Sequence, residues 1–281
     1  MKPPRPNRRK LLKATTYTVG GATLFSGTAS AVEFTQLEYD TIGDPFGDDW
    51  YSVDAAVLGE DSVGDSDVRD MYKVLKTTLD HLVNTYGQLD GAKVWAASST
   101  AGVEDIGDAR DAQLGSKYED EAGLWVTYNE GSKSRWNEVE WNDGDPQCSD
   151  HGGDRPSLYD PNRADEISTE RDVPLAMTHL QSGNMEIAGV HEFLHLLIDD
   201  DVPKVREMTD TDHSPPSHTL STIVEIEGLN LATPMSYAGD AYEKGPSCSS
   251  SKNRDGWTPR PSSCTAKAAR YTADWVKAND C

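Results

Sequence analysis

Residues 185–198 form the segment that most restricts how this chain can fold. Apolar side chains recur in it at intervals of three and four residues: Ile187, Val190, Leu194 and Leu197. This pattern predicts a helix, and a helix places His191 and His195 one turn apart on the same face. Two imidazoles in that arrangement can reach one zinc ion, and the spacing His-Glu-x-x-His sets Glu192 beside the first ligand as a base for zinc-bound water. The segment therefore predicts a helix that carries a zinc site.

A zinc site of this kind needs a third protein ligand and one open position. The downstream candidates are Asp201, His213, His218, Glu225 and Glu227. We favour His218 because histidine is the commonest zinc ligand among these residue types. His218 also adjoins the apolar run 220–226, which would hold it in place, whereas His213 lies farther out in the same polar segment.

The helix motif and the later segment Ala232–Tyr237 (ATPMSY) together resemble the metzincin clan of zinc peptidases, in which a methionine-containing turn lies beneath the metal. The resemblance implies a zinc endopeptidase with Met235 in that turn and Tyr237 as a hydrogen-bond donor to the developing oxyanion. The chain departs from the clan after the motif, since Ile198 replaces the glycine that ends the helix and Asp201 stands at the third-ligand position. A β-branched residue disfavours the positive φ of that break, which argues against Asp201 as a ligand.

Two other interpretations stay open. One is a gluzincin-type hydrolase, in which Glu225 or Glu227 supplies the third ligand from a later helix. The other is a non-catalytic exported metal-binding protein, in which the histidines hold a structural ion. The position of Glu192 favours catalysis, because a closed structural site needs no base.

The patterns of apolar residues in the rest of the chain predict an α+β fold with a mixed twisted sheet. A regular apolar run from Val68 to Tyr86 predicts a long helix capped by Ser66-Asp67, and a last helix is expected from Ala266 to Lys277, capped by Thr265. Strands are predicted at 92–97, 123–128 and 136–141, and a loop at 142–163. Metzincins have the same order of long helix, sheet, active-site helix and C-terminal helix.

The first 31 residues predict a twin-arginine-type signal peptide. Arg8-Arg9 precedes a weakly apolar stretch, and Ala29-Ser30-Ala31 offers a cleavage site before Val32. We therefore expect a secreted protein, with no membrane span in the mature chain because the apolar stretch is too short and too polar. The acidic segment 32–64 is a candidate pro-segment, and 65–281 is the expected peptidase domain.

The charge of the chain is strongly negative. The formal net charge is −22, and residues 32–281 hold 20 Lys and Arg against 48 Asp and Glu, which gives −28. Such a surface is tolerated where salt screens it, so we expect a halophilic source. It argues against nucleic acid or anionic membranes as partners, and leaves a monomer acting on a peptide or protein substrate as the expectation.

Four cysteines, Cys148, Cys248, Cys264 and Cys281, predict two disulfides in an exported chain, with three connectivities open. Their spacing contains no C-x-x-C pair, so a cysteine-based zinc site is not expected.

Overall fold

The structure, a computed structural model, describes residues 32–46, 49–103, 106–118, 121–127, 138–139, 175–179, 185–200, 202–209, 216–235 and 254–278. Contacts within the chain separate residues 1–31 from one compact unit, Val32–Cys281. The expected signal peptide and the expected loop at 142–163 lie outside the described residues.

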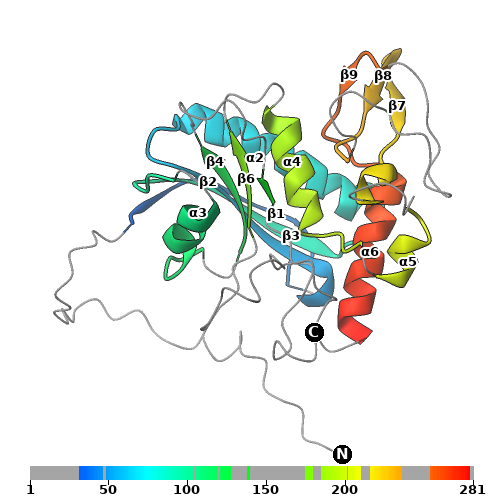
Figure 1. The fold of residues 1–281 in the computed structure, drawn as a ribbon, viewed down its shortest axis with the longest axis horizontal. Coiled ribbons are helices and arrows are strands. Elements are labelled where there is room, and N and C mark those ends of the chain that lie inside the picture. The colour runs from blue at the N-terminus through cyan, green and yellow to red at the C-terminus, as the bar shows by residue number, and fades with distance from the viewer. Residues whose placement is uncertain are drawn as a thin grey trace, which may run out of the picture. The chain divides into compact units, whose positions relative to one another are not determined.

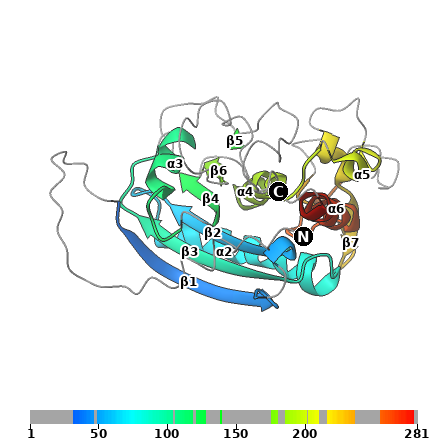
Figure 2. The ribbon, with the colours of Figure 1, turned by 90° about the horizontal axis from the view of Figure 1, so that it is seen from below.

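Within the described residues, a six-stranded mixed sheet forms the centre of the compact unit, in the order β1-β3-β2-β4-β6-β5 (Figures 1 and 2). Its strands are β1 (Phe34–Gly43), β2 (Ser52–Gly59), β3 (Gly91–Ser99), β4 (Ala122–Thr127), β5 (Glu138–Val139) and β6 (Leu175–His179). The inner strands β3, β2, β4 and β6 are parallel, whereas β1 and β5 pair antiparallel with β3 and β6. This sheet, flanked by separate helices, confirms the predicted α+β class.

The strands predicted at 92–97 and 123–128 are confirmed as β3 and β4, and the run 136–141 contains β5. Every residue of β4 is buried, as are Ala55 to Gly59 of β2. Burial on both faces is normal for parallel strands covered by helices, and it explains why these runs are continuously apolar.

Residues 32–64 supply two strands that the sequence pattern did not predict. The edge strand β1 begins the sheet, and β2 lies between β3 and β4, with Ala55 paired to Val94 on one side and Ala122 on the other. Asp54 interrupts the apolar run of β2, but its carboxylate pairs with Lys93 Nζ at 2.9 Å on the neighbouring strand. The acidic segment is therefore an integral part of the sheet.

One face of the sheet is covered by α2 (Asp65–Asp80), which continues into a π-helical turn, η2 (His81–Thr85). Its apolar stripe is fully buried: Val68, Met71, Leu75 and Leu79. The predicted long helix is confirmed: its helical residues end at Thr85, and Gly87, which has a φ of 59°, follows the cap residue Tyr86. The predicted cap is wrong, because the cap position is Gly64, and Ser66 and Asp67 lie in the first turn.

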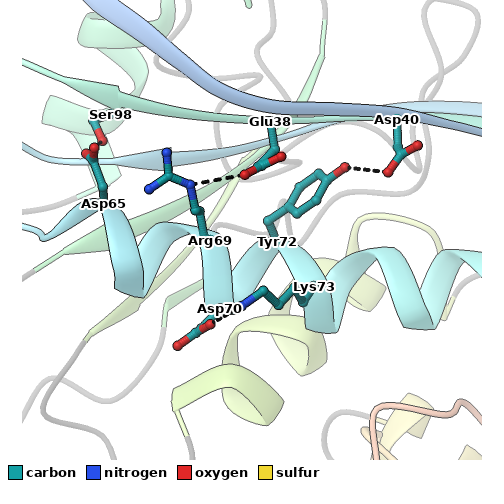
Figure 3. Close-up of polar contacts among 8 residues, drawn as sticks. All are labelled: Glu38, Asp40, Asp65, Arg69, Asp70, Tyr72, Lys73 and Ser98. Carbon is teal, nitrogen blue, oxygen red and sulfur yellow. Dashed lines mark hydrogen bonds and ion pairs between the residues drawn. The ribbon is translucent and has the colours of Figure 1, made fainter.

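Polar side chains tie α2 to β1 and β3 (Figure 3). The contacts that cross between the elements are Arg69 Nε to Glu38 Oε1 (3.1 Å), Tyr72 Oη to Asp40 Oδ2 (3.1 Å) and Ser98 Oγ to Asp65 Oδ1 (2.5 Å). Partly exposed contacts of this kind contribute little each, but together they hold α2 against β1 and β3.

The opposite face of the sheet packs against α3 (Ile106–Gln113). Trp125 of β4 is fully buried there, and its Nε1 donates to Gln113 Oε1 at 3.0 Å. A Cβ on Gly123 would lie 2.2 Å from that oxygen, so a larger residue there would push the Gln113 side chain away from its present position.

The C-terminal part of the chain contains the helix with the histidine pair. It comprises α4 (Met185–His195), α5 (Pro203–Arg206), the 3-10 helix η5 (Pro216–Leu220), a small sheet of β7 (Ile223–Ile226), β8 (Leu229–Ala232) and β9 (Gly256–Trp257), and α6 (Ser263–Ala278). The predicted cap of α6, Thr265, is wrong. The backbone N–H of Thr265 donates to Ser262 Oγ at 2.9 Å, so Ser262 is the cap. Cys264 in α6 is disulfide-bonded, but Cys148, Cys248 and Cys281 lie outside the described residues, so the pairing stays a prediction.

No helix in the described part of the chain combines the length and the apolar character that crossing a bilayer requires.

Candidate metal centre

Helix α4 positions the first two predicted ligands. It packs against β6 and α2, with Val190, Phe193 and Leu194 in the main core. His191 and His195 are 6% and 3% exposed, and their Nε2 atoms lie 3.2 Å apart. The four-residue spacing thus brings both rings to one point, as predicted.

The 3-10 helix η5 adds His218 to this pair. Its Nε2 atom lies 3.1 Å from that of His191 and 3.2 Å from that of His195. The next apolar residue, Leu220, is fully buried, and its carbonyl oxygen accepts a 2.5 Å hydrogen bond from Ser262 Oγ, which anchors η5. Among the described residues, these three buried histidines form the group that could hold a metal ion.

Hydrogen bonds to the outer nitrogen of each ring decide which of its two nitrogens carries the proton. His191 Nδ1 lies 2.8 Å from Pro234 O, and because a carbonyl oxygen only accepts, Nδ1 carries the proton. A neutral imidazole has one N–H, so Nε2 presents a lone pair to the other rings. His195 Nδ1 lies 3.3 Å from Ser217 Oγ, whose hydroxyl donates to Asp200 Oδ2 at 3.0 Å, which gives the same tautomer.

Burial keeps these rings uncharged. Desolvation lowers the pKa of His191 to about 4, against the opposing effect of its hydrogen bond to Pro234. The pKa of His195 lies well below its usual value because of burial and, secondarily, the nearby His191 and His218. Metal binding needs neutral imidazole, so His191 and His195 are ready to bind at neutral pH.

The spacing of the nitrogens is compatible with zinc. Nitrogen ligands about 2.0–2.1 Å from a tetrahedral zinc ion lie about 3.3 Å from one another. The Nε2 atoms here are separated by 3.1, 3.2 and 3.2 Å. Lone pairs that converge at this distance repel unless a cation lies between them, so the arrangement itself fits a metal-binding function.

Glu192 follows the first histidine on α4 and is buried. Burial raises the pKa of its carboxyl group well above the usual value. Carboxyl groups with shifted pKa values are common among the residues that carry out general acid–base chemistry. The site therefore combines three nitrogens that could hold a metal ion with a buried carboxyl group next to His191 in the chain.

The segment that resembles a methionine turn lies against this site. Met235 is fully buried in the same core cluster as α4, and the preceding residue, Pro234, accepts the hydrogen bond from His191. Tyr237, the expected oxyanion donor, lies outside the described residues.

The other candidates for the third ligand do not join the cluster where the structure describes them. Glu225 lies on β7, and Glu227 lies in the turn before β8 with a φ of 53°, so neither is on the later helix that a gluzincin-type site needs. Asp201 and His213 lie outside the described residues.

The predicted helix ends earlier than expected. It stops at His195 rather than Ile198, and Leu196 and Leu197 donate to Phe193 O and Leu194 O in a tight turn. The turn forms without glycine, and Ile198 does not have a positive φ.

Sequence reasoning missed Asp200 and Ser217, which lie behind His195. Asp200 stands among three consecutive aspartates and looked like ordinary acidic surface. The position of Ser217 directly before His218 gave no signal for this role, because Ser217 contacts His195, 22 residues away in the chain.

Comparisons with protein-family models and with curated proteins found no match.

Proposed function

We propose that this protein is a zinc-dependent metallopeptidase, with His191, His195 and His218 as zinc ligands and Glu192 as the catalytic base. The observation that carries the proposal is the convergence of three Nε2 atoms within 3.2 Å, with the buried Glu192 next to His191 in the chain. Three protein ligands leave a coordination position open, which is typical of catalytic zinc, whereas structural zinc has four.

When bound, zinc supplies Lewis-acid chemistry, polarising the scissile carbonyl group and lowering the pKa of water. Glu192 takes one proton from the attacking water, whose oxygen adds to the carbonyl carbon. The carboxyl group then gives that proton to the amine nitrogen as the peptide bond breaks.

Tyr237 belongs to the proposal through the metzincin resemblance. A tyrosine at this position would donate to the negative charge that develops on the carbonyl oxygen. Tyr237→Phe is expected to lower kcat about 10²-fold or more with zinc content unchanged. An unchanged kcat would remove this residue from the mechanism.

The decisive experiment separates metal binding from catalysis. Glu192→Gln keeps the size of the side chain but not the base, so it should retain zinc and lose about 10²–10⁴-fold of peptidase activity. His191→Ala should lose both zinc and activity. Cleavage of a diverse peptide library is assayed in concentrated salt, with zinc measured by elemental analysis.

Each result has a distinct meaning. Full activity in Glu192→Gln would refute the proposed mechanism. Stoichiometric zinc with no cleavage of any peptide would favour the alternative of a non-catalytic metal-binding protein.

We also propose that the chain is exported by a twin-arginine signal and acts outside the cell in concentrated salt. The paired Arg8-Arg9 and the net charge of −22 support this proposal. Replacing both arginines by lysine should retain the protein inside the cell, and secretion at the normal level would contradict the proposed route.

A further inference from the structure

Behind the histidine cluster, a chain of hydrogen bonds runs from a carboxylate to one of the ligands. Asp200 Oδ2 accepts from Ser217 Oγ at 3.0 Å, and Ser217 Oγ lies 3.3 Å from His195 Nδ1. Ser217 is fully buried and Asp200 is partly buried. The Asp200 carboxylate is therefore linked to a ligand of the proposed metal site through one side chain.

One arrangement of protons satisfies this chain of hydrogen bonds. A carboxylate only accepts, so the single hydroxyl proton of Ser217 points at Asp200. The Ser217 oxygen is then left to accept from His195 Nδ1–H. With its only proton on Nδ1, His195 must direct the lone pair of Nε2 at His191 and His218.

The backbone holds Asp200 in place for this contact. The N–H of Asp199 donates to Thr272 Oγ1 on α6 at 3.1 Å, and Val202, just beyond, is 1% exposed. The turn that carries Asp200 is thus fixed at both ends.

The dipole of helix α4 does not favour a carboxylate at the position of Asp200. Asp200 follows the C-terminal end of α4, where the helix dipole disfavours negative charge. A divalent cation held by His195 would compensate for this, because the carboxylate and the ion would lie at opposite ends of one hydrogen-bonded chain.

We propose that Asp200 and Ser217 are positioning residues of the metal site. Through Ser217, the Asp200 carboxylate fixes the ring and tautomer of His195 and makes it a stronger ligand. This inference rests on the metal site proposed above, but it concerns metal affinity and not the cleavage reaction.

Zinc affinity tests the proposal on the full chain, by competition with a chromophoric chelator in concentrated salt. Asp200→Ala and Ser217→Ala should each raise the zinc Kd about 10- to 100-fold. The zinc Kd of the double variant should be no higher than that of the single variant with the higher Kd, because both substitutions break the same chain of hydrogen bonds. Glu207→Ala, which removes an exposed carboxylate beyond α5, is the matched control and should leave the Kd unchanged.

A second readout distinguishes positioning from a general structural role. Nitrogen-15 NMR of the metal-free protein should show His195 protonated at Nδ1, and Ser217→Ala should shift it toward the Nε2–H tautomer. Far-UV circular dichroism of each variant verifies folding, and Asp200→Ala, at a partly buried position, serves if Ser217→Ala does not fold.

The outcomes separate this inference from the proposed function. If His195→Ala abolishes zinc binding but Asp200→Ala and Ser217→Ala bind zinc as tightly as Glu207→Ala, the positioning role is overturned and the metal site stands. If His195→Ala binds zinc as tightly as the parent, the metal site itself is wrong, and this inference falls with it.

Discussion

Acid should destabilise the metal-free protein through His191, by an amount that follows from its burial. The ring is 6% exposed, and desolvation lowers its pKa from 6.5 to about 4. Between these values the unfolded state binds more protons, so this contribution to stability is complete above pH 6.5 and is lost as the pH falls through 4. At about 1.4 kcal/mol per pH unit, the loss is about 3 kcal/mol.

Neighbouring groups also change the free energy of unfolding as the pH falls, so the contribution of His191 is measured against a variant that lacks its ring. His195 has a lowered pKa and acts in the same direction as His191. Glu192 has a raised pKa, so the folded state gains a proton there and is stabilised relative to the unfolded state as the pH falls. His191→Asn removes one titrating ring, while its amide can still donate to Pro234 O.

Urea unfolding of chelator-treated protein in concentrated salt, from pH 7.5 to pH 4, measures the effect. The free energy of unfolding of the parent relative to His191→Asn should fall by about 3 kcal/mol across this range. If the free energies of unfolding of the parent and of His191→Asn change in parallel with pH, the ring is not buried in its neutral form, and the reasoning is refuted.

Other perturbations test the metal, the sheet and the charge. Free zinc at 100 times its Kd should raise the free energy of unfolding of the parent by about 2.7 kcal/mol, seen as a higher Tm; a similar rise in His218→Ala would exclude His218 as a ligand. Deleting residues 32–64 removes β2 from between β3 and β4, so the remainder should show no cooperative thermal unfolding, and a sharp transition would contradict the sheet order. Dialysis into low salt should unmask repulsion among the carboxylates and reduce the far-UV circular dichroism; an unchanged spectrum would argue against salt dependence.

Much of the helical structure was predictable because helices are local. The apolar spacing of 68–86 and 185–198 identified α2 and α4, although the predicted ends were displaced. The cap of α6 was misassigned because Ser262 and Thr265 are both good capping residues, and only the hydrogen bond to Ser262 distinguishes them.

The role of residues 32–64 could not be predicted from composition. Asp54 breaks the apolar pattern of β2, and its partner Lys93 lies 39 residues away on β3. A strand is stabilised by its neighbours in the sheet, so its pattern is weak in the sequence when a charged residue is paired across strands.

For the site itself, the sequence alone determined the pair His191 and His195 and the position of Glu192, because a four-residue spacing on a helix fixes their geometry locally. It also favoured His218, but only the tertiary structure brings His218 to the pair, from 23 residues beyond His195. The link from Asp200 through Ser217 was decided in the same way. Contacts between distant segments depend on how the core closes around them, and no local pattern in the chain encodes that closure.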